Sequence, residues 1–179
     1  MLQQFIFAGF GGQGILTAGL LLANTASVHG KEVIWMPSYG SEMRGGTANC
    51  SVKIDDEMIS SPFIKKIDYL VVMNKPSLDK FLPQVKEGGT VIMDSSIITD
   101  APEMPGLHTV LVPANEICEK LKNARGANIC MLGALAGSSD LFTKEEYEAG
   151  IKDYFAGKPQ FHEGNMAAFE AGYQCAKGE

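Results

Sequence analysis

Apolar runs and glycine turns alternate along the first part of the chain in the manner of an α/β protein. Residues 4–8 form a short apolar run that leads into GFGGQG at positions 9–14, and residues 15–28 are rich in Leu and Ala. This pattern predicts a strand, a tight glycine turn and a helix. Gly30 then ends the helix, and residues 31–36 (KEVIWM) are expected to form a second strand that closes a first βαβ unit.

The next segment predicts a loop followed by a hairpin. Residues 37–47 (PSYGSEMRGGT) are too polar and too rich in glycine for a regular element, so we expect a loop. Residues 48–54 (ANCSVKI) alternate between polar and apolar positions, which favours a strand. Asp55 and Asp56 then predict a turn into a short strand at residues 58–59, which would make a hairpin.

The rest of the chain repeats the alternation. Apolar, β-branched runs at residues 69–73, 90–93 and 108–112 predict strands of a sheet that is covered on both faces. Thr143 and Glu146 have the spacing of a capping box at the start of a helix. Further helices are expected at residues 77–85, 115–121, 128–136, 144–155 and 164–176. Residues 128–136 (NICMLGALA) are apolar almost all round, which predicts a buried helix or an interface helix.

These elements predict one α/β domain over residues 1–179. It should be a three-layer sandwich, Rossmann-like, with a mostly parallel sheet and helices on both faces. The 179 residues, 45% of them hydrophobic, suffice for a core that needs neither a disulfide nor a metal.

Charge and cysteine content exclude several classes of protein. The net charge of −6 and pI of about 5.1 argue against nucleic acid as a partner. No CxxC pair occurs, so the cysteines fit neither a zinc ribbon nor a thioredoxin motif nor an iron–sulfur ligand set, and we expect no metal ligand. The stretch at residues 15–28 is shorter than the roughly 20 apolar residues of a membrane span. We therefore expect a cytoplasmic protein with free thiols and no membrane partner. The four cysteines are Cys50, Cys118, Cys130 and Cys175.

The first glycine turn satisfies the GxGxxG fingerprint at positions 9–14, directly after a strand and before a helix. Such a turn can bring backbone N–H groups to an anion. A dinucleotide site also needs an acid at the end of the second strand, but residues 34–37 hold none and Glu32 lies at the strand's start. A P-loop does not fit either, because Ile15 and Leu16 replace the required Lys and Ser or Thr. An anion site and a tight turn without a ligand both stay open.

The second loop begins where the second strand ends, so both loops should lie at the carboxyl edge of the sheet. Tyr39, Glu42 and Arg44 offer a ring, an acceptor and a fork-shaped cation. These groups suit a phosphate, a carboxylate or a partner surface. A solvated Arg44 paired with Glu42 is the alternative interpretation.

The two loops together, GFGGQG at 9–14 and PSYGSEMRGGTANCSV at 37–52, resemble the gamma subunit of the 2-oxoacid:ferredoxin oxidoreductases. The resemblance covers nearly the whole chain. It continues through MNKPSLD at 73–79, NI at 128–129, LGA at 132–134, Asn165 and AFEAGY at 168–173. The chain's length and the segment EMRGGTANC at 42–50 are most similar to the separate gamma chain of a 2-oxoglutarate or branched-chain 2-oxoacid enzyme.

The resemblance implies a subunit that is active only within a complex. Enzymes of this family convert a 2-oxoacid to an acyl-CoA and reduce ferredoxin, using thiamine diphosphate, Mg²⁺, iron–sulfur clusters and coenzyme A. This chain lacks a thiamine motif and a cysteine set for a cluster, so we expect it to bind none of these cofactors alone. It should pack on thiamine-binding and ferredoxin-like subunits, help to close their active site and contribute to handling coenzyme A.

Carried onto this sequence, the resemblance implies a set of cofactor-binding candidates: Gly11, Gly12, Gln13, Tyr39, Arg44, Gly45 and Gly46. Glu42 and Arg44 are the catalytic candidates. Arg44 and the N–H groups of the glycine turn are expected to meet anionic groups, while Tyr39 and Glu42 shape the loop.

Three other hypotheses remain open: an indolepyruvate oxidoreductase small subunit, a free-standing Rossmann nucleotide-binding dehydrogenase or flavoprotein, and a scaffold that binds only protein. The helices at 12–28 and 128–136 are predicted to expose apolar surface in the isolated chain. Such surfaces commonly mark interfaces, so the isolated chain should self-associate, for instance into a homodimer.

Overall fold

A six-stranded mixed sheet organises the computed structural model, which describes residues 1–39 and 47–178. The strand order is β2-β3-β1-β4-β5-β6, and three of the five neighbouring pairs are parallel. Only β3 runs against the other five strands. The strands are β1 (Gln3–Phe10), β2 (Glu32–Tyr39), β3 (Thr47–Asp55), β4 (Ile67–Val72), β5 (Val85–Asp94) and β6 (His108–Val112).

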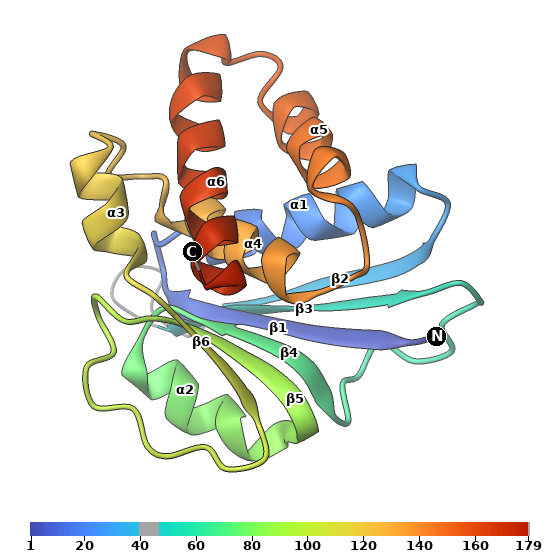
Figure 1. Ribbon diagram of the computed structural model, residues 1–179. Coiled ribbons are helices and arrows are strands. Elements are labelled where there is room, and N and C mark those ends of the chain that lie inside the picture. The colour runs from blue at the N-terminus through green and yellow to red at the C-terminus, as the bar shows by residue number, and fades with distance from the viewer. Residues whose placement is uncertain (40–46, 179) are drawn as a thin grey trace.

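Helices cover both faces of this sheet, so the predicted three-layer α/β sandwich is confirmed (Figure 1). One face carries α1 (Ile15–Val28), α4 (Ala127–Ser138), α5 (Lys144–Tyr154) and α6 (His162–Lys177). The other face carries α2 (Lys75–Phe81) and the short 3-10 helix η1 (Leu82–Gln84). The remaining helices are α3 (Ala114–Lys120), which follows β6, and the 3-10 helix η2 (Pro159–Phe161), which leads into α6. The helix expected at 77–85 therefore starts two residues earlier and is shorter.

The central strands are buried on both faces, as their continuous apolar runs predict. Successive side chains of a strand point to opposite faces. In β1, Phe5 and Phe7 accordingly pack in the core beneath α1 and α4, whereas Ile6 and Ala8 pack in the core beneath α2. One strand thus contributes to two separate cores.

The region around β3 differs from the sequence prediction. β3 pairs antiparallel with β2 and also with β1, so it lies between the two strands of the expected βαβ unit. The strand predicted at residues 58–59 is wrong, because both edges of β3 are already paired and no edge is left for it. β2 also continues to Tyr39, through Pro37, where a loop was expected. An edge strand tolerates such a proline.

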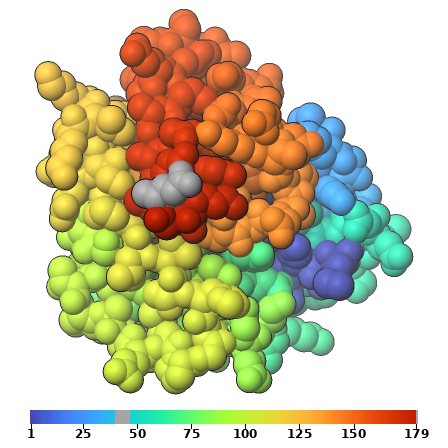
Figure 2. Space-filling view, viewed as in Figure 1, coloured from blue at the N-terminus to red at the C-terminus, as the bar shows by residue number. Residues whose placement is uncertain are grey.

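The α4 helix is enclosed by this chain itself, with ten of its twelve residues buried. Gly133 of α4 lies against the carbonyl of Phe169 in α6, and Gly172 of α6 lies against the carbonyl of Cys130. A side chain on either glycine would overlap the opposite backbone. The space-filling view shows α5 and α6 as the outer surface on this side (Figure 2). The prediction that α4 exposes apolar surface is therefore wrong.

The start of α5 agrees with the sequence prediction. The Thr143 side chain accepts a hydrogen bond from the N–H of Glu146, and the Glu146 carboxylate accepts one from the N–H of Thr143, so the predicted capping box is confirmed. In the described ranges, no helix combines the length and the apolar character that crossing a bilayer would take.

Candidate functional site

The first glycine turn and the end of β2 lie at the same edge of the sheet. Tyr39 pairs with Ala48 of β3, and Ala48 pairs with Gly9 of β1, so the carboxyl ends of β2 and β1 are level across three strands. This confirms the predicted common edge for the starts of both loops. Tyr39 is 60% exposed there. The candidates Glu42, Arg44, Gly45 and Gly46 lie outside the described residues.

Two glycines allow the chain to turn sharply from β1 into α1. Gly12 has φ of +93° and Gly14 has φ of +76°, a conformation that favours glycine. Gly14 is also the N-cap of α1, and within the part of the chain that the structure describes no side chain caps this helix. The first N–H groups of α1 are therefore free to meet an anion.

The side chain of Gln13 stabilises the turn through two hydrogen bonds to the backbone. Its Oε1 accepts a hydrogen bond of 2.6 Å from the N–H of Phe10, and its Nε2 donates one of 3.1 Å to the carbonyl of Met73, just after β4. Both ends of the amide are thus engaged within the chain. The structure gives Gln13 a role in shaping the turn, and direct contact with a ligand stays a prediction.

The glycine turn opens onto a pocket of about 520 Å³, which we call the turn pocket. Arg125, which is exposed, is the one charged residue among the described residues that line it. A cation beside an uncapped helix N-terminus is suited to an anionic group. The lining residues are Gly12, Gln13, Gly14, Met73, Asn115, Ala124, Arg125 and Ala127.

A buried carboxylate positions one wall of the turn pocket. Asp94, at the carboxyl end of β5, is fully buried. It accepts hydrogen bonds from the N–H of Ser96 at 3.0 Å, the N–H of Ala114 at 3.1 Å and the Asn115 side-chain amide. Asp94 therefore fixes Asn115, which lines the pocket.

Sequence reasoning missed three residues of this site, namely Asp94, Asn115 and Arg125. A signal existed for Asp94, because an acid directly after the buried run at 90–93 falls at the edge of a parallel sheet where ligands bind. Arg125 carries no comparable signal, since it reaches the turn only through the tertiary fold.

The dinucleotide hypothesis loses support in this geometry. In dinucleotide-binding folds the second strand lies next to the first and ends in the acid that holds the ribose. Here β3 separates β1 from β2, and Glu32 lies opposite Asp55 at the other end of β2. No acid occupies the described carboxyl end of β2 at Trp35–Tyr39.

The thiols are poorly placed to act as nucleophiles or ligands at this edge of the sheet. Cys50, Cys118 and Cys130 are buried and Cys175 is partly exposed. Burial raises the pKa of Cys50 to about 12. Over residues 1–39 and 47–178, no three His, Cys, Asp or Glu side chains gather as metal ligands.

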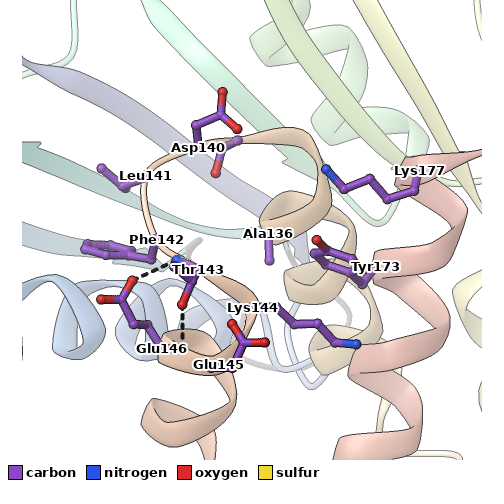
Figure 3. A pocket seen from close by; sticks show the side chains of 11 residues that line it. Ala136, Asp140, Leu141, Phe142, Thr143, Lys144, Glu145, Glu146, Tyr173 and Lys177 are labelled. Atoms are coloured by element: carbon purple, nitrogen blue, oxygen red, sulfur yellow. Dashed lines mark hydrogen bonds between the residues drawn. The ribbon is translucent and has the colours of Figure 1, made fainter.

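A second pocket, of about 440 Å³, lies at the start of α5 (Figure 3). Its helix end is already closed by the capping box of Thr143 and Glu146, drawn as dashed lines. Lys144 pairs with Glu170, and both Lys144 and Lys177 lie over the ring of Tyr173, at 5.1 and 5.4 Å from its centroid. Because these donors and cations already have partners, this pocket is less suited to binding an anion than the turn pocket is.

Comparison with known proteins gives a consistent set of relatives. Residues 4–175 match the family model described as pyruvate ferredoxin/flavodoxin oxidoreductase. The chain is 41% identical over 172 residues to the ketoisovalerate oxidoreductase subunit VorA of Methanothermobacter thermautotrophicus, covering 95% of this chain and 35% of that protein. It is 36% identical over 181 residues to the 2-oxoglutarate synthase subunit KorC of Methanocaldococcus jannaschii, covering 99% of this chain and 95% of that protein.

A solved structure agrees with these relatives. The gamma subunit of a keto/oxoacid ferredoxin oxidoreductase from Geobacter sulfurreducens superimposes with a TM-score of 0.88 at 29% identity, over 99% of this chain and 98% of that one. The chain spans about a third of the length of the first curated relatives that it matches, 35% and 36%.

Proposed function

This chain belongs to the pyruvate ferredoxin/flavodoxin oxidoreductase family, and we propose that it serves as the gamma subunit of a 2-oxoacid:ferredoxin oxidoreductase. Such an enzyme decarboxylates a 2-oxoacid oxidatively, forms an acyl-CoA and reduces ferredoxin. The observation that carries the proposal is the end-to-end match, in length and fold, to separate subunits of this kind. The chain would act only within a complex.

For the substrate we propose 2-oxoglutarate or a branched-chain 2-oxoacid. The relatives named for ketoisovalerate and for 2-oxoglutarate, at 41% and 36% identity, support this choice. Indolepyruvate, the substrate of a related branch, is the alternative outcome of the same assay.

Partner subunits would supply the redox and decarboxylation chemistry. We propose that thiamine diphosphate and Mg²⁺ are bound by a thiamine-binding subunit, and the iron–sulfur clusters by a ferredoxin-like subunit that passes electrons to ferredoxin. This chain would contribute to binding coenzyme A. The turn pocket fits an anionic part of that molecule, because Arg125 and the uncapped start of α1 lie together there.

Copurification tests the assembly and the substrate. A tagged copy of this chain, expressed in its native host, should carry the thiamine-binding and ferredoxin-like subunits with it. The purified complex should oxidise 2-oxoglutarate or 2-oxoisovalerate, with coenzyme A and ferredoxin, faster than pyruvate or indolepyruvate. A chain that purifies alone, or a complex without 2-oxoacid oxidation, overturns the proposal.

Arg44→Ala tests the predicted role of the second loop in coenzyme A handling. Losing a charge-assisted contact costs about 1.5 to 3 kcal/mol, roughly tenfold to hundredfold in affinity. The apparent constant for coenzyme A should rise by that factor, while the thiamine-bound intermediate still forms. Failure to assemble would make Arg44 an interface residue, and unchanged half-reactions would make the loop a scaffold. Lys66→Ala is the matched control, because Lys66 is exposed and directly precedes β4 at the opposite edge of the sheet.

A further inference from the structure

A third pocket, of about 480 Å³, adjoins the turn pocket and shares Ala124 and Arg125 with it. It lies among the 122–126 loop, the end of α5 and the starts of α1, α4 and α6. We call it the basic pocket. Of the cofactor-binding candidates that the structure describes, Gly11, Gly12, Gln13 and Tyr39, none lines it.

The basic pocket is positively charged, although the chain as a whole is negatively charged. Lys122, Arg125 and Lys158 line it, and no Asp or Glu of residues 1–39 and 47–178 does, although the net charge of the chain is −6. None of these three cations forms an ion pair with another described residue. They are therefore available to an anionic ligand.

Three helices begin at this pocket. Thr17 of α1, Asn128 of α4 and Asn165 of α6 belong to early turns of their helices and line it. No side chain of the described residues caps α1 or α4, whereas α2 and α5 are capped by Asn74 and Thr143. α6 continues directly from η2, and the N–H of His162 is bonded to the carbonyl of Pro159, so the free N-terminal turns here are those of α1 and α4. Uncapped N-terminal turns present free N–H groups and the positive end of the helix dipole, which adds to the charge of the side chains.

One buried side-chain amide in the pocket has a hydrogen-bond partner for its nitrogen but none for its oxygen among the described residues. Asn128 is 7% exposed, and its Nδ2 donates a hydrogen bond of 3.1 Å to the carbonyl of Gly14. Its Oδ1 is buried and has no hydrogen-bond partner among the described residues. A buried polar atom without a partner is costly, so it points to a donor that a ligand would supply.

Aromatic rings and an unusual lysine complete the pocket. Tyr154 and Phe161 line it and are each 42% exposed, which leaves ring surface for a planar group. Lys122 has φ of +54° and is the one non-glycine residue of the described chain with a positive φ. It follows the C-cap of α3, where glycine is usual, so the fold keeps a lysine there at a cost to the backbone.

We propose that the basic pocket binds a nucleoside phosphate. The base stacks against Tyr154 or Phe161, and the phosphate meets Lys122, Arg125, Lys158 and the starts of α1 and α4. A base amino group or ribose hydroxyl donates to Asn128 Oδ1. Two sources share this chemistry, namely the phosphorylated adenosine end of coenzyme A and a free nucleotide. The pocket alone carries the proposal, and only the coenzyme A source rests on the proposed function.

Calorimetry on the full purified chain tests the pocket, with adenosine 3′,5′-bisphosphate, AMP, coenzyme A and inorganic phosphate as probes. At least one adenine nucleotide should bind ten times more tightly than phosphate. If the bisphosphate and coenzyme A bind best and compete, the source is the acyl carrier. If AMP binds and coenzyme A does not, the source is a free nucleotide.

Lys122→Gly is the decisive variant, because glycine suits the positive φ and should keep or raise stability while removing the charge. Nucleotide affinity should fall about tenfold, as expected for one charge-assisted contact. Arg125→Ala should have a similar effect, and Lys66→Ala should have none. The proposal is overturned if no nucleotide binds below about 1 mM, or if both pocket variants bind as the wild type does. Because the isolated chain is titrated, a failure here is separate from a failure of the complex to assemble.

Discussion

The side-chain Nε2 of Gln13 donates a hydrogen bond of 3.1 Å to the carbonyl oxygen of Met73, which is 60 residues later in the chain. Met73 in turn donates its N–H to the carbonyl of Ala8 at 2.9 Å. Gln13 therefore locks the glycine turn to the ends of two neighbouring parallel strands. The shape of the turn depends on this side chain as much as on its glycines.

Replacing Gln13 by Leu removes both hydrogen bonds of the amide and should destabilise the chain by about 1 to 3 kcal/mol. Denaturant unfolding measures the cost, and hydrogen exchange at the N–H of Phe10 should accelerate. Gln84→Leu is the control, because exposed Gln84 donates a single bond of 3.3 Å and should change stability by less than about 0.5 kcal/mol. An unchanged exchange rate at Phe10 would contradict the role of Gln13 as a brace.

The contact between α4 and α6 predicts a strong effect of one methyl group. Gly172→Ala places a Cβ against the Cys130 carbonyl, and overpacking of this kind typically costs about 1 to 3 kcal/mol. The higher helix propensity of alanine, worth up to about 1 kcal/mol, offsets only part of that cost. At Gly157 a Cβ would meet no atom within 4 Å, so Gly157→Ala should be close to neutral in the same thermal unfolding experiment.

Burial predicts a strict order of thiol reactivity. In the native chain Cys175, which is partly exposed, should react first with a thiol reagent, while Cys50, Cys118 and Cys130 should react only on unfolding. The pKa of Cys50 is about 12, so raising the pH from 7 to 9 should not make it reactive. Mass spectrometry after brief labelling identifies the modified residue, and early modification of Cys50 would refute this order.

The raised pKa of Cys50 also predicts that the free energy of unfolding falls at alkaline pH. Above the ordinary thiol pKa of 9.0, the unfolded chain releases a proton that the folded chain holds until about pH 12. Unfolding therefore becomes easier as the pH rises between these values. In Cys50→Ala this share of the alkaline loss should disappear, which guanidinium titrations at pH 8 and pH 10 can measure.

Asp94 should be the most sensitive acid in the fold. Asp94→Ala removes the acceptor of three hydrogen bonds and leaves buried donors unpaired, at a cost of about 3 kcal/mol or more. Asp94→Asn should cost less, because the amide retains one acceptor oxygen. Asp100→Asn, whose exposed carboxylate pairs with Lys75 at 3.6 Å, is the control and should change stability by at most about 1 kcal/mol. Equal effects of Asp94→Ala and Asp100→Asn would argue against the positioning of Asn115.

Features with local causes could be predicted from the sequence. The turn at 9–14 is encoded by glycines that take a positive φ, and the start of α5 by the reciprocal bonds of Thr143 and Glu146. The insertion of β3 between β1 and β2 could not be predicted, since the period of a strand says which face is buried but not which strand lies beside it. The burial of α4 likewise depends on α6, which follows it at a distance along the chain.

That dependence has a consequence for biosynthesis. A ribosome releases α4 before α6, so this almost completely buried helix has no cover until the later helix has emerged. Transiently exposed apolar segments of this kind are the ones that chaperones bind and that aggregate when translation stalls. Packing of α6 onto α4 at the close glycine contact is therefore also the step after which the nascent chain no longer exposes this apolar segment.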